Sequence, residues 1–176
     1  MILDSQKKLY RTKIEQFIKR LEALILSKYE LVDEEYANSK DPVPFGERLR
    51  LKYQRIEEGQ EWGQAWESAW FHLQGRIPEK WQEQEVVAHL DFNGEALIFS
   101  PQGDPLQGLT NGSVFGNVTR HTFILTPKAQ GGETVDLWVE GAANSIVGIN
   151  QPSDPPRGTV DRHGNYLGKV NRMRIA

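Results

Sequence analysis

The spacing of apolar residues changes at Gly46, and this change constrains the fold more than any other feature of the sequence. Residues 5–28 carry an apolar side chain at every third or fourth position with no Gly or Pro between them, which predicts one long amphipathic helix. After Gly46, apolar and polar residues alternate in short segments separated by turn residues. The sequence therefore predicts a mainly β domain preceded by one long N-terminal α-helix.

Three regions follow from this pattern. Residues 1–46 comprise the helix and a connector, NSKDPVPFG, whose two prolines exclude helix. Residues 47–150 form the β domain, and residues 151–176 form a C-terminal segment. We expect the helix to pack on its own domain or on a partner. A membrane surface is the second interpretation, because Lys and Arg accompany the apolar face.

Two hairpins are expected in the β domain. Residues 85–92 and 95–99 alternate on either side of Asn93-Gly94, a pair that favours a two-residue hairpin turn. Residues 121–126 and 134–140 alternate around a glycine-containing loop and predict a second hairpin. The long glycine-rich connection between these hairpins favours a sandwich or jelly roll over a tight meander.

Four of the five tryptophans lie in residues 59–81, and the spacing alone leaves the structure of this stretch open. Trp62, Trp66 and Trp70 recur at every fourth residue, which places them on one face of a helix and equally on one face of a strand. The β segments downstream and the proline that follows favour a strand over residues 69–77. In that strand, apolar side chains alternate with polar ones, and Trp70 is the exception because it falls on the polar face.

Composition excludes several kinds of chemistry. The chain has no cysteine, so disulfides, thiolate catalysis and cysteine-ligated zinc are excluded. The four histidines are too scattered to predict a metal site. No apolar run reaches membrane length and the first residues lack the apolar core of a signal peptide, so we expect a cytoplasmic location and no membrane partner.

Charge is unevenly distributed, although the net charge is only -3. Basic residues outnumber acidic ones by 7 to 3 in residues 1–28 and by 5 to 1 in residues 157–176, which leaves 9 basic and 20 acidic residues between them. Neither basic end is a run of like charge flanked by aromatics, so no nucleic-acid partner is expected. The pattern favours docking of a basic end on an acidic surface.

Several strings, taken in order, resemble one known family. GQEWG, SAWFHLQGRIPEKW, LDFNGEALIF, GDPLQGLT, the strand at Arg120 and VDLWVEGAANSIVG are similar to the N-terminal domain of the cytosolic-type α-mannosidases of glycoside hydrolase family 38. The resemblance covers about residues 50–150. It implies a jelly-roll, galactose-binding-like β-sandwich.

The resemblance also implies an accessory role. Enzymes of that family are retaining hydrolases with a carboxylate nucleophile beside a zinc ion, and those residues belong to a large catalytic domain that follows this one. No string here resembles that domain, so neither catalytic residues nor metal ligands are predicted in this chain, and whether it is itself an enzyme stays open. Zinc is expected in the missing catalytic domain, toward which residues 151–176 would lead. The expected partner is that domain or another subunit, including a second copy.

A free-standing carbohydrate-binding module is the alternative function. Sugars stack on exposed aromatic rings and bond to amides and charged groups. The competing interpretation is that the tryptophans are core or interface residues. An assembly module built on the basic helix is a third hypothesis. The candidate residues for contact with a sugar or a neighbouring domain are Gln60, Trp62, Trp66, Arg120 and Asn144.

Overall fold

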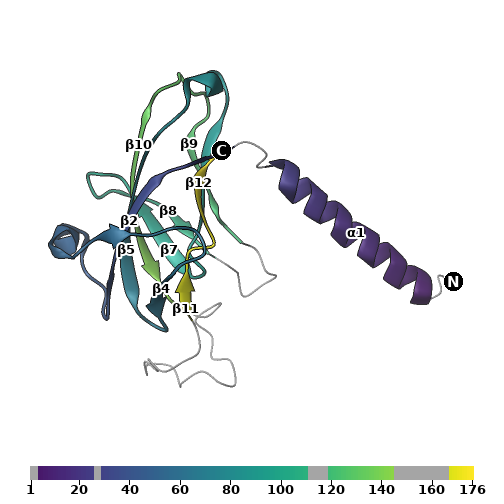
Figure 1. The fold of residues 1–176 in the computed structure, drawn as a ribbon, viewed down its shortest axis with the longest axis horizontal. Helices are drawn as coiled ribbons and strands as arrows, with labels where there is room; N and C mark the ends of the chain where they lie inside the picture. The colour runs from purple at the N-terminus through teal and green to yellow at the C-terminus, as the bar shows by residue number, and fades with distance from the viewer. Residues whose placement is uncertain (1–3, 26–28, 111–118, 145–166) are drawn as a thin grey trace.

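The structure is a computed structural model that describes residues 4–25, 29–110, 119–144 and 167–176. It confirms a mainly β fold with an N-terminal helix, α1 (Asp4–Ile25) (Figure 1). Two 3₁₀ helices, η1 (Phe45–Arg50) and η2 (Glu79–Trp81), interrupt the strands. No helix in these ranges is long and apolar enough to cross a membrane.

The strands form antiparallel sheets of four, six and two strands. In chain order they are β1 (Glu30–Leu31), β2 (Asp33–Ser39), β3 (Gln54–Arg55), β4 (Glu61–Gln64), β5 (Ser68–Arg76), β6 (Val86–Asp91), β7 (Glu95–Phe99), β8 (Pro105–Leu109), β9 (Thr122–Thr126), β10 (Thr134–Ala142), β11 (Leu167–Lys169) and β12 (Arg172–Ile175). The first sheet has the order β1-β12-β6-β9, and the second has the order β3-β2-β5-β10-β7-β8. The third is a ribbon of β11 and β4.

One apolar core lies between the two large sheets. Phe71 of β5 and Val139 of β10 come from the six-stranded sheet, while Leu90 of β6 and Met173 of β12 come from the four-stranded sheet. All four are at most 1% exposed. Because side chains alternate along a strand, each sheet turns one face inward, and each fully buried large apolar side chain stabilises the fold by about 1.5–3 kcal/mol.

Both predicted hairpins are wrong. β6 pairs with β12 and β9 in one sheet, whereas β7 pairs with β10 and β8 in the other. β9 and β10 are divided in the same way. The predicted alternation is present, but the chain crosses between sheets at these turns, as a jelly roll requires. Gly94 is needed for close approach, because a Cβ there would lie 2.2 Å from the carbonyl oxygen of Ala142.

The sandwich includes strands from outside residues 47–150, the range predicted for the β domain. β1 and β2 come from the segment expected to be helix and connector, and β11 and β12 come from the expected C-terminal segment. These strands gave a weak signal because β1 and β11 have two and three residues and β2 is rich in acidic residues. The strand expected over residues 69–77 is confirmed as β5.

The predicted N-terminal helix is also confirmed, but it does not pack on the sandwich. Figure 1 shows α1 lying apart from the two sheets. Every side chain from Gln6 to Leu21 is exposed. Because most of the stability of a protein helix comes from packing of its amphipathic face, the exposed apolar face of α1 points to a partner surface.

Candidate functional site

Trp62 lies in the core. It is 2% exposed, and its Nε1 donates a hydrogen bond to the carbonyl oxygen of Phe92 at 3.1 Å. Its ring meets Phe71 edge to face, with centroids 5.4 Å apart. The backbone of β11 passes over the ring so closely that a Cβ on Gly168 would lie 2.4 Å from Cε2. Since no face of the indole is open, Trp62 cannot stack on a sugar, and its interpretation as a core residue is the correct one.

Trp66 lies in the turn between β4 and β5 and remains partly exposed. Its φ of 68° is in the left-handed region, which a bulky residue rarely adopts and which costs about 1–2 kcal/mol. Its backbone N–H donates to the carbonyl oxygen of Ala143 at 2.7 Å, which holds the turn in place. Of the two candidate contact tryptophans, Trp66 is therefore the one that is not buried.

The polar candidates lie on separate turns. The Oε1 of Gln60 accepts the backbone N–H of the residue three positions earlier at 2.9 Å, and the Oδ1 of Asn144 accepts the N–H of the first residue of β7 at 3.0 Å. Arg120 is exposed, and its backbone forms an isolated bridge. The hydrogen bond from Trp66 to Ala143 brings Trp66 close to Asn144, whereas Gln60 and Arg120 make their own hydrogen bonds elsewhere in the chain.

A second aromatic layer, not found by sequence analysis, covers the outer face of the six-stranded sheet. Trp70 of β5 lies 5.6 Å from Phe45 and 5.3 Å from Phe99 between ring centroids. Its Nε1 donates to the carbonyl oxygen of Val43 at 2.8 Å. The predicted connector thus folds over this face, which explains why Trp70 is buried on the side opposite to the main core.

Arg48 extends this layer with a buried charge. It is 8% exposed, and its guanidinium carbon lies 3.5 Å from the ring centroid of Phe45 and 4.2 Å from that of Trp138. Burial lowers the pKa of Arg48, and the facing rings offset part of its desolvation. His72 stacks on Trp138 at 4.0 Å and its Nε2 lies 2.8 Å from Oδ1 of Asp136. The contacts of Phe45 and Arg48 with the rings of the sheet hold the 42–53 segment against its outer face.

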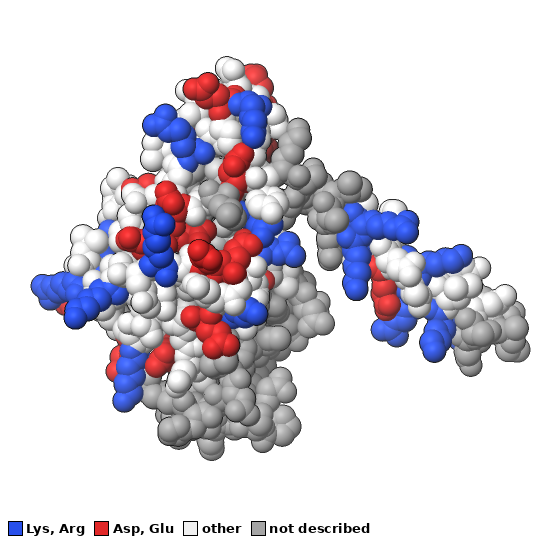
Figure 2. Space-filling view, viewed as in Figure 1, with Lys and Arg blue, Asp and Glu red and all other residues white. Residues whose placement is uncertain are grey.

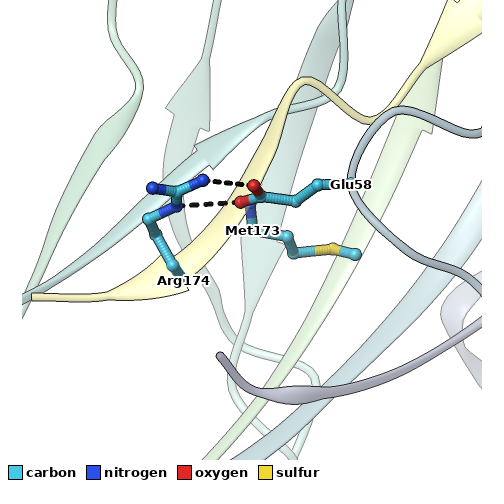
Figure 3. Close-up of polar contacts among 3 residues, drawn as sticks. All are labelled: Glu58, Met173 and Arg174. Carbon is cyan, nitrogen blue, oxygen red and sulfur yellow. Dashed lines mark hydrogen bonds and ion pairs between the residues drawn. The ribbon is translucent and has the colours of Figure 1, made fainter. Parts of the chain in front are cut away.

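Glu58 joins the loop before β4 to β12 (Figure 3). Its Oε1 accepts the Nε–H of Arg174 at 2.9 Å and the backbone N–H of Met173 at 2.8 Å, and its Oε2 accepts from Nη2 of Arg174. Burial favours the neutral acid, but these hydrogen bonds outweigh it and lower the pKa of Glu58. The guanidinium carbon of Arg174 also lies 4.1 Å from the ring centroid of Tyr29.

A cavity of about 440 Å³ lies beside this ion pair, and we call it the acidic pocket. Its apolar walls are Val32 and Ile56, and Arg55 is the basic residue in its lining. Burial, followed by the negative charges of Glu58, Asp33 and Glu57, raises the pKa of Glu34 to about 8. Glu34 therefore keeps its proton near neutral pH mainly because it is buried, and the neighbouring acids add to this effect. Acidic residues outnumber Arg55 in the lining, so the acidic pocket favours a cationic occupant. Its acidic lining residues are Asp33, Glu34, Glu57 and Glu58.

The two histidines of the four-stranded sheet do not form a metal site. The ring centroids of His89 and His121 are 6.2 Å apart, and Nε2 of His121 is 3.8 Å from Oδ2 of Asp91. Burial, with a contribution from the positive charge of Arg172, lowers the pKa of His89 to about 4. Within the described ranges, no group of three or more His, Asp or Glu residues could hold a metal ion. The described residues therefore do not fit a zinc site.

The antiparallel sheets, the shared core and the chain crossings between sheets define the class of this protein, a jelly-roll β-sandwich with an appended helix. Residues 30–172 match the family model described as the jelly roll domain of α-mannosidase, and the chain belongs to this family. The match confirms the resemblance seen in the sequence. It begins at β1, so α1 lies outside the matched range.

Two relatives carry the same family name. The chain is 29% identical over 111 residues to alpha-mannosidase 2C1 of Mus musculus and 28% identical over 113 residues to alpha-mannosidase 2C1 of Homo sapiens. Each match covers 63% of this chain but only 10% of the relative. The chain thus corresponds to a small part of each relative.

Proposed function

We propose that this chain is a non-catalytic accessory domain of a zinc-dependent α-mannosidase of glycoside hydrolase family 38, which packs on the catalytic domain or on another subunit. The observation that carries the proposal is the family match over residues 30–172. The small share of each relative that is matched supports it, because most of those proteins lies outside this domain. The cytoplasmic location stays a prediction, which imaging of the tagged native protein would test.

Four acidic residues line the acidic pocket, so a hydrolytic site has to be weighed there. Glycoside hydrolysis requires one protonated carboxyl group and one free carboxylate flanking the same bond. Glu34, with its raised pKa, resembles the first, but Glu58 does not supply the second. Both oxygens of Glu58 already accept hydrogen bonds from Arg174 or Met173. The remaining acids, Asp33 and Glu57, are exposed. This arrangement supports an accessory role.

Two measurements test the proposal together. Intact mass of the native polypeptide, captured with an antibody to this domain, should give a product several times larger than 20.1 kDa. The purified chain, supplied with zinc, should hydrolyse an aryl α-mannoside no faster than a mock preparation. A native product near 20.1 kDa, or hydrolysis that Glu34→Gln abolishes, would contradict the accessory role.

The carbohydrate-binding alternative has less support. Trp62, Trp70, Trp81 and Trp138 are at most 6% exposed, which leaves Trp66 as the tryptophan with open surface. A sugar platform normally presents a ring face. Titration with mannose to millimolar concentration should therefore leave tryptophan fluorescence unchanged. A saturable change that is lost in Trp66→Ala would restore the binding-module interpretation.

A further inference from the structure

The N-terminal helix presents an apolar face that nothing in the described structure covers. Tyr10, Ile14, Phe17 and Leu21 follow the i, i+3 and i+4 spacing of one helix face. Their exposed fractions are between 41% and 60%. A helix that keeps this much apolar surface in water is one half of an interface.

The basic residues of α1 are placed on both sides of the helix. At 100° per residue, Lys13 and Arg20 lie along one edge of the apolar face, whereas Lys8 and Lys19 lie on the opposite face. Arg11 is paired with Glu15 within the helix at 3.2 Å. The surface that covers the apolar face therefore meets positive charge at its edge and should itself be acidic.

The sandwich carries a surface of this kind. Figure 2 shows Asp and Glu side chains gathered over the middle of the visible face of the sandwich, and Lys and Arg side chains along α1. The acidic pocket combines three carboxylates and the protonated carboxyl group of Glu34 with the aromatic ring of Tyr29, which is 46% exposed. Its negative charge is only partly balanced, since Arg174 is already engaged with Glu58 and Arg55 is the other base at the site.

We propose that α1 of one chain docks on the acidic pocket of a second copy, and that the reciprocal contact forms a two-fold dimer. This inference names a partner for the accessory domain and so rests on the proposed function. The apolar face of the helix would cover Tyr29, which is 46% exposed, and its Lys13–Arg20 edge would face the carboxylates of Asp33 and Glu57. In a two-fold dimer, the helix of each chain binds the pocket of the other chain. No helix or pocket is then left free to bind a third chain.

The chain's own helix is a poor occupant of its own pocket. Only residues 26–28 separate α1 from Tyr29, which lines the pocket. Folding back would place the last helical turn nearest the pocket, and that turn contains no basic residue. The basic edge begins at Arg20, further along the helix. A second copy is free of this restriction.

Sedimentation velocity of the whole 176-residue chain is the primary test. We expect a monomer–dimer equilibrium that weakens as salt is raised, because the contact is partly electrostatic. The helix variant is Lys13→Glu with Arg20→Glu, and its control is Lys8→Glu with Lys19→Glu, which changes the same charge on the opposite face. We expect the helix variant to weaken dimerisation at least tenfold and the control to change it by no more than about twofold.

The pocket variant is Asp33→Lys with Glu57→Lys, two exposed acids of the lining. Its control is Glu85→Lys with Glu95→Lys, which reverses two exposed charges outside the pocket. The pocket variant should be monomeric on its own. Mixed with the helix variant, it should form a heterodimer, because both reciprocal contacts then join opposite charges. Circular dichroism and thermal melting should show a folded sandwich in all four variants.

Several results would overturn the proposal. These are a monomeric wild-type chain at about 100 μM in low salt, a dimer unaffected by either variant, and equal loss in a variant and its control. A monomer that binds anionic vesicles through α1 would assign the helix to a membrane surface instead. Failure of the dimer leaves the native mass and the mannosidase assay unchanged, so it is distinguishable from failure of the accessory role.

Discussion

Replacing Gly168 with alanine should destabilise the sandwich, because β11 crosses the face of a trapped indole. The added Cβ would lie 2.4, 2.6 and 2.7 Å from Cε2, Cζ2 and Cδ2 of Trp62, far inside ordinary contact distance. The ring cannot move aside easily, since it is 2% exposed and its Nε1 is bonded to the carbonyl oxygen of Phe92. Overpacking of this kind costs about 1–3 kcal/mol, and the fixed ring places this case near the upper end.

Urea unfolding followed by far-UV circular dichroism measures this cost. For a chain of this length, about 3 kcal/mol corresponds to a fall of roughly 6–12 °C in Tm. The midpoint should fall while the m-value stays constant. Gly46→Ala is the matched control, because a Cβ there meets nothing within 4 Å. It should change the free energy of unfolding by less than about 1 kcal/mol.

A double-mutant cycle with Trp62→Leu identifies the cause. Trp62→Leu alone should cost several kcal/mol, because it leaves a cavity in the core. In that background Gly168→Ala should cost much less, with a coupling energy of at least about 1 kcal/mol. If Gly168→Ala is neutral, or costs the same in both backgrounds, the packing described for Trp62 is incorrect. A Trp62 that served as an open sugar platform would give that result.

Three further predictions concern stability. Burial raises the pKa of Glu34 from 4.5 to about 8 in the folded state, so the free energy of unfolding of the wild type falls as pH rises between these values. Glu34→Gln should remove this fall. In urea titrations at several pH values, the variant should be more stable than wild type by about 2 kcal/mol above pH 8, after allowance for the partial exposure of Glu34. The pKa of Glu58 is lowered in the folded state, so the ionised carboxylate stabilises the fold above pH 4.5 and this stabilisation is lost as pH falls through the folded-state pKa. The difference in Tm between wild type and Glu58→Gln should disappear over that acidic range. Trp66→Gly should be more stable than Trp66→Ala by about 1 kcal/mol in urea, because both lose the indole but only glycine adopts a φ of 68° without strain.

Long elements with a clear period were predictable from the sequence, and short ones were not. α1 was anticipated because it repeats one interval over many residues. The spacing within β5 was ambiguous, and this strand was anticipated from the β segments that follow it and from the proline after its end. β1 and β11 contain two and three residues, too few for any interval to emerge. Their place in the sheets comes from pairing with distant segments, and no local pattern encodes that pairing. For the same reason, strands of the sandwich also lie outside residues 47–150, the range expected to form the β domain.

The sequence also did not reveal which sheet each strand joins after a turn. Asn93-Gly94 is a strong hairpin signal, yet the chain leaves one sheet and enters the other there. The alternation of β6 and β7 specifies which side chains are buried, and it is satisfied equally by a hairpin or by two strands facing each other across a core. The choice depends on β10 and β12, which supply better partners from further along the chain.

The tryptophans that lie close together in the sequence occupy different layers of the structure, and this too depends on distant segments. Trp62 and Trp70 stand eight residues apart, and both are buried, but Trp62 belongs to the main core while Trp70 lies beneath the segment that carries Phe45. That second layer exists because an irregular segment returns over the sheet, which no spacing rule describes. The acidic pocket has the same origin, since it joins the start of β2 and the residues before it to the end of β3 and the loop before β4. A basic helix could be recognised from the sequence alone, but the acidic surface that complements it appears only when distant loops are brought together.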